Sequence, residues 1–99
     1  MRKIKEYVDM IDEELESAKV YAEMSIDYKV QGESEWANKF KEAANDELKH
    51  ANYMHELAVG VIAKYRERMT PPQNMLEKWD KAHAEYIEKA AWIKTMLSM

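Results

Sequence analysis

Helix-breaking residues are so scarce in this chain that it can form only a few long elements. The 99 residues include two glycines and two prolines. A β-sandwich or a β-barrel needs many turns, which so few turn-forming residues cannot supply. The rest of the sequence is rich in Ala, Glu, Lys, Leu and Met, which are strong helix formers. We therefore expect an all-α fold in one domain that spans residues 1–99.

The breaks divide the chain into three expected helices, at about residues 3–31, 34–69 and 72–98. Gly32 suits the left-handed position that ends a helix, and Ser34 suits the N-cap of the next one. The segment from Thr70 to Gln73 has the pattern of a capping box with proline at the first helical position. The turn at Gly32 is so short that the first two helices must pack antiparallel.

Charge and residue usage exclude several classes of protein. The net charge is −4, from 15 basic and 19 acidic residues, so we expect no nucleic-acid partner. The absence of cysteine excludes disulfides, thiolate metal sites and cysteine nucleophiles. No apolar run is long enough for a membrane span or a signal peptide, so we expect a cytoplasmic protein without a membrane partner.

The length of the second helix indicates self-association. At 1.5 Å per residue it would be over ~50 Å long. A globule of this chain length has an expected radius of gyration of only ~13 Å. We therefore expect a second copy, in a homodimer or a higher homo-oligomer, to cover part of this helix.

Three polar side chains lie on the apolar faces of the first two helices. Glu14 has uncharged neighbours one turn away on both sides, among them Met10 and Ala18. Glu47 is flanked by alanines, which leave space beside it, and His50 follows one turn later. An ionised carboxylate on a buried face is costly unless it is paired or coordinates a metal.

Counting along the chain from the turn predicts that these residues converge. Glu14 lies as far before Gly32 as His50 lies after it, and Glu47 lies one helical turn nearer to Gly32 than His50. In antiparallel helices of equal rise, residues at equal distances from the turn face each other. A Glu-x-x-His pair and a facing carboxylate form half of a di-iron carboxylate site, and a two-fold dimer would supply the other half. Oxygen and imidazole ligands suit iron, and also manganese or zinc.

Two short motifs support a family resemblance. The segment Glu13-Glu14-Leu15-Glu16, followed by Tyr21, and the later Glu47-Leu48-Lys49-His50-Ala51 resemble the ferritin-like superfamily. The greatest similarity is to the encapsulated ferritins, in which each short chain supplies half of a four-helix bundle. The resemblance covers roughly Asp12 to Leu57. It implies an antiparallel hairpin plus a third helix that forms a ferritin-like four-helix bundle through dimerisation.

The resemblance also implies a ferroxidase, which oxidises Fe(II) to Fe(III) with dioxygen. Glu14, Glu47 and His50 would then be the ligands that each subunit supplies, with Glu47 bridging two irons and Tyr21 supporting the centre. Glu13 and Glu16 match acids of a secondary metal site. An encapsulin shell would be a further partner, but the tail from Ile93 to Met99 contains no glycine-leucine cargo peptide.

Two alternatives remain open from the sequence. One is a metal-free helical interaction protein, in which Glu14 and Glu47 would each pair with a lysine or an arginine. The other retains a dinuclear metal site for peroxide reduction or for a structural role. Two further histidines lie on apolar faces, and we expect His83 in the core or an interface and His55 in an interface.

Overall fold

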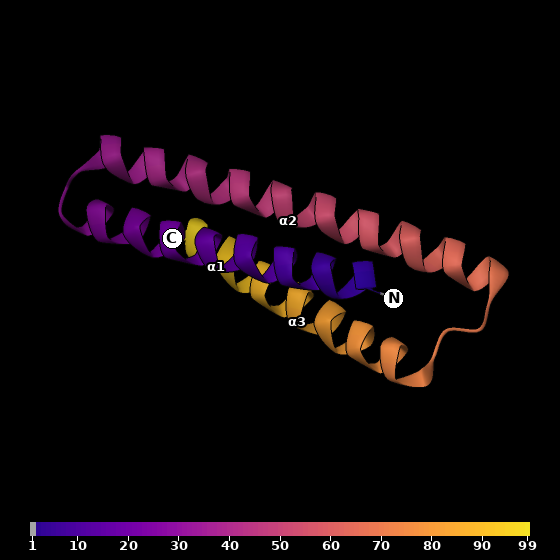
Figure 1. Ribbon diagram of the computed structural model, residues 1–99. Coiled ribbons are helices and arrows are strands. Elements are labelled where there is room, and N and C mark those ends of the chain that lie inside the picture. Colours follow the sequence, from indigo (N-terminus) through magenta and orange to yellow (C-terminus); the bar gives the residue numbers. More distant parts are fainter. Residues whose placement is uncertain (1) are drawn as a thin grey trace.

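The chain forms three long α-helices, as Figure 1 shows. The computed structural model describes residues 2–99 and places α1 at Arg2–Val30, α2 at Ser34–Arg68 and α3 at Gln73–Leu97. This confirms the all-α prediction, and every helix boundary lies within one residue of its expected position. Within this range no helix is long and apolar enough to cross a membrane.

A tight turn joins α1 and α2 into an antiparallel hairpin (Figure 1). The backbone N–H of Glu33 donates to the carbonyl of Tyr28 at 2.9 Å, and that of Gly32 donates to the carbonyl of Lys29 at 3.1 Å. This pair of bonds is the Schellman motif, which needs a left-handed residue after the helix. Gly32 has φ +80°, so the prediction that it ends the first helix is confirmed.

The two capping predictions are wrong. Ser34 is the first residue of α2, and Glu33 takes the N-cap position without a side-chain hydrogen bond. The third helix begins at Gln73 with Pro72 at the N-cap, also without a side-chain bond. The backbone carbonyls of these two N-cap residues accept the first helical hydrogen bonds. The Gln73 amide donates forward to Glu77 at 3.3 Å and not back toward the helix start.

The third helix runs back along the hairpin and gives the molecule the shape of a rod. Its dimensions are 55 × 17 × 17 Å. The Lys29 ammonium donates to the carbonyl of Met99, so the C-terminus lies near the end of α1, as Figure 1 also shows. All three helices contribute to the main core, which comprises Ile11, Leu15, Ala18, Ala22, Ala44, Leu48, Ala51, Ala90, Ile93 and Met96. A smaller cluster comprises Ile4, Ala58, Ile62 and Trp79.

The hairpin has a second apolar face that is only partly covered. Two rows of residues, spaced alternately by three and four positions, form what we call the open face. On α1 the row is Tyr7, Met10, Glu14, Ser17, Tyr21, Met24 and Tyr28; on α2 it is Trp36, Phe40, Ala43, Glu47, His50, Met54, Leu57 and Val61. None of these side chains is fully buried. The rows meet across the hairpin, where Tyr28 stacks on Phe40 with ring centroids 5.5 Å apart.

The open face corrects one expectation from the sequence. Met10, Trp36 and Leu57 belong to the faces expected to be buried, but they are 43%, 49% and 50% exposed. The physical reason is the number of helices. A helix in a four-helix bundle buries its side chains against two neighbours, whereas α1 and α2 have each other and a single third helix.

Candidate metal centre

Glu14, Glu47 and His50 converge in the middle of the open face. The Nδ1 atom of His50 lies 3.5 Å from Oε2 of Glu14 and 3.8 Å from Oε2 of Glu47. One ligand atom from each residue lies within 4.8 Å of the others. The convergence predicted by counting from Gly32 is therefore confirmed, and the Schellman turn is the local structure that fixes this register.

The three side chains are more exposed than the sequence predicts. The exposed fractions are 31% for Glu14, 24% for Glu47 and 53% for His50. The sequence places them on buried faces, but one chain alone leaves this side of the hairpin uncovered. A cation can therefore reach the three ligand atoms directly from solvent.

The carboxyl group of Glu14 changes the acidity of Glu47. The pKa of Glu47 is raised above its ordinary value of 4.5, first by a hydrogen bond with Glu14, then by burial and by the negative charge of Glu14. His50 acts in the opposite direction. Glu47 therefore binds a proton more readily than an isolated carboxyl group does. A divalent cation competes with that proton for the same carboxylate oxygens.

The ligand set fits iron, manganese or zinc. Two carboxylates and one imidazole, without thiolate, are ligands that all three metals accept. Three protein ligands also leave coordination positions open for a substrate or for water. A dinuclear carboxylate site uses ligands from four helices, which is twice the number of helices that contribute here.

The remaining predicted site residues lie outside this cluster. The Tyr21 ring packs against Phe40 with centroids 6.0 Å apart, and no hydrogen bond among residues 4–99 joins it to the three ligands. Glu13 and Glu16 are exposed on α1. Within the described part of the chain, Glu14, Glu47 and His50 are the one group of three or more acidic or histidine residues with metal-binding geometry. The roles of Tyr21, Glu13 and Glu16 stay predictions.

The ion pairs of the two glutamates bear on the metal-free alternative. That alternative predicts a lysine or an arginine beside each carboxylate. Among residues 4–99, both Glu14 and Glu47 have His50 as their ion-pair partner instead. Within this range, the lysine or arginine partners that the metal-free alternative predicts are not found beside Glu14 and Glu47.

Sequence reasoning missed a contact between the other two histidines. His55 Nε2 and His83 Nδ1 lie 2.7 Å apart, joining α2 to α3. The same counting rule could have located this region, because His55 lies as far before the end of α2 as Tyr86 lies after the start of α3. The rings of His55 and Tyr86 stack with centroids 4.5 Å apart.

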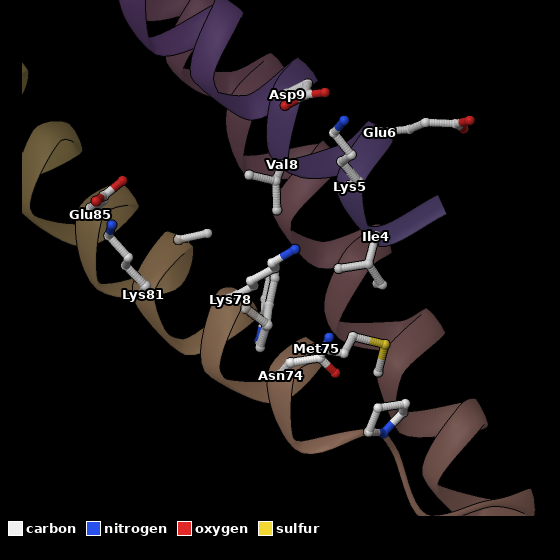
Figure 2. Close-up of a pocket in the computed structure, with 13 residues that line it drawn as sticks. Ile4, Lys5, Glu6, Val8, Asp9, Asn74, Met75, Lys78, Lys81 and Glu85 are labelled. Carbon is white, nitrogen blue, oxygen red and sulfur yellow. The ribbon is translucent and has the colours of Figure 1, made fainter. Parts of the chain in front are cut away.

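A groove lies away from the metal centre, between the start of α1 and the first half of α3. Its volume is about 870 Å³. Figure 2 shows Ile4, Val8 and Met75 pointing into it, with Lys81 and Glu85 on its α3 side. No residue of the Glu14, Glu47 and His50 cluster lines the groove. The groove therefore does not belong to the metal centre.

No family model, curated protein or solved structure matches this chain. The assignment of function consequently depends on the geometry of the site.

Proposed function

We propose that two copies of this chain form a ferritin-like di-iron centre that oxidises Fe(II) to Fe(III) with dioxygen. The observation that carries the proposal is the convergence of Glu14, Glu47 and His50 at one level of the open face. In the reaction, two Fe(II) substrate ions each lose one electron. One dioxygen molecule takes up these two electrons and two protons, and leaves as hydrogen peroxide.

The open face supports a dimer as the active form. Its two rows have the alternating three- and four-residue spacing with which helices pack in coiled coils and four-helix bundles. Met10, Trp36 and Leu57 each expose more than two fifths of their surface along these rows. Burial of such apolar surface favours association by roughly 25 cal/mol per Å². A two-fold axis through this face would place two sets of ligands opposite each other.

Each ligand residue has a distinct role in this proposal. Glu47 interacts with both Glu14 and His50, which suits it to bridge two metal ions. Glu14 supplies a second carboxylate from the facing helix, so the site also links α1 to α2. His50 supplies an imidazole nitrogen from the same helix as Glu47, one turn further along.

The test measures the rate of Fe(II) oxidation in air from the ferric absorbance. We expect the wild-type chain to oxidise Fe(II) faster than buffer, and Glu47→Ala to reduce the rate to that of buffer while circular dichroism remains helical. Asp46→Ala is the matched control because Asp46 is exposed and lies outside the ligand cluster. It should retain the wild-type rate. A wild-type rate equal to buffer, or an unchanged rate in Glu47→Ala, would overturn the proposal.

A further inference from the structure

A second cluster of metal-binding side chains lies between α2 and α3. His55 Nε2 and His83 Nδ1 are 2.7 Å apart, and their rings stack with centroids 4.8 Å apart. Both residues are half-buried. The cluster uses none of the ligands of the proposed iron centre.

The hydrogen bond shows that the two facing nitrogens are aimed at a shared point. One imidazole donates its N–H and the other accepts with its lone pair. A change of tautomer in the donor ring turns both lone pairs toward that point without loss of a proton. A tetrahedral zinc ion binds imidazole nitrogen at about 2.0–2.1 Å, which places two such nitrogens about 3.4 Å apart. The two rings would have to separate by about 0.7 Å from their 2.7 Å contact, a movement open to half-buried side chains.

The surroundings of the pair hold the rings in place and attract a cation. Tyr86 and Trp79 stack on His55 with centroids 4.5 and 5.5 Å away. The Tyr86 hydroxyl donates to Oδ1 of Asn52 at 3.4 Å, which ties the same region of α3 to α2. Glu56 follows His55 on α2, and its carboxylate adds negative charge near the pair.

We propose that His55 and His83 form a second site, which binds a zinc-type divalent cation and links α3 to α2. Imidazole nitrogens suit Zn²⁺, Cu²⁺ and Ni²⁺, whereas the carboxylate-rich open face also accepts iron and manganese. Water would complete the coordination on the solvent side. Because the ligands come from two helices, a bound ion stabilises the folded chain.

The test is a calorimetric titration with Zn²⁺ alone. It uses the double variant Glu47→Ala, His50→Ala, so that the proposed iron centre cannot contribute. We expect this background to bind one zinc ion per chain and to melt at a higher temperature with zinc. Addition of His55→Phe or His83→Phe should weaken the affinity by about tenfold or more, because each removes a ligand and keeps an aromatic ring.

Tyr53→Phe is the matched control, since Tyr53 is exposed on α2 and lies outside the cluster around the two histidines. Its zinc affinity should equal that of the background. If the background binds no zinc, or if neither phenylalanine variant weakens binding in a chain that remains helical, the proposal is wrong. Failure of this test leaves the iron centre untouched, because the background already lacks two of its ligands.

Discussion

The Nδ1 atom of His50 on α2 lies 3.5 Å from Oε2 of Glu14 on the antiparallel helix α1. Glu47, one turn before His50, also lies against Glu14, and the hydrogen bond between the two carboxyl groups is the main cause of the raised pKa of Glu47. The tight turn between α1 and α2 thus brings together three side chains that can coordinate a cation. The contact between the two carboxyl groups also determines how the metal-free protein should respond to pH.

The first prediction concerns Glu47 in the metal-free protein. Its pKa in the folded state is higher than the ordinary 4.5, so the folded state holds the proton more tightly than the unfolded state. This contribution to stability is fully present below pH 4.5 and is lost as the pH rises through the raised pKa. Glu47→Gln should therefore raise the melting temperature at pH 7 but not at pH 4. An equal change at both pH values would contradict the carboxyl pair.

A second prediction concerns the histidine pair, whose pH dependence has the opposite sign. The pKa of His55 in the folded state is lowered below 6.5, so the unfolded state takes up the proton first. Stability should fall as the pH drops from about 6.5 through the lowered pKa. Thermal melts between pH 7 and pH 5 without metal would show a slope that His55→Phe reduces. A slope that this substitution leaves unchanged would place the titrating group elsewhere.

The third prediction tests the open face as the dimer interface. Leu57 is 50% exposed on the α2 row, and Val59 is 46% exposed but lies outside that row. Leu57→Lys should weaken the dimer by about tenfold or more, because it places a charge in an apolar contact. Val59→Lys adds the same charge and should leave the dimer intact. Sedimentation equilibrium measures both. Equal effects of the two substitutions would show that the interface lies elsewhere.

The fourth prediction compares the two glycines. Gly32 has φ +80°, and a Cβ there would meet nothing within 4 Å, so the cost of Gly32→Ala is backbone strain of about 1–2 kcal/mol. Gly60 lies inside α2 and its Cβ would also meet nothing within 4 Å. Gly60→Ala should therefore stabilise the chain by about 0.5–1 kcal/mol. Urea unfolding measures both free energies. Changes of the same sign would be inconsistent with the Schellman turn.

Local sequence signals predict the helices and the register of the ligands. Gly32 marks the turn, and the equal distances of Glu14 and His50 from it are sufficient to predict their convergence, because antiparallel helices rise equally. The capping predictions for Ser34 and Thr70 failed because Glu33 and Pro72 take the N-cap positions, each without a side-chain hydrogen bond. The side-chain preference for an N-cap position therefore did not locate either helix start.

Burial was harder to predict than register. The periodicity of α2 places Trp36 and Ala44 on one apolar arc, but Ala44 is buried and Trp36 is 49% exposed. The periodicity of apolar residues identifies the faces of a helix that are apolar. It does not identify the helix or the second chain that packs against each face. For the same reason, His83 could be assigned to a core or interface from sequence, whereas its contact with His55 depends on how α3 packs against α2.

The most direct test of the iron centre is an anaerobic titration with Fe(II) that counts the ions bound per chain. The account predicts one Fe(II) per chain, two per dimer, in the wild type. Separate substitution of Glu14, Glu47 or His50 by alanine should abolish this binding, while Asp46→Ala should leave it unchanged. Absence of Fe(II) binding in the wild type, or full binding in all three ligand variants, would contradict the account.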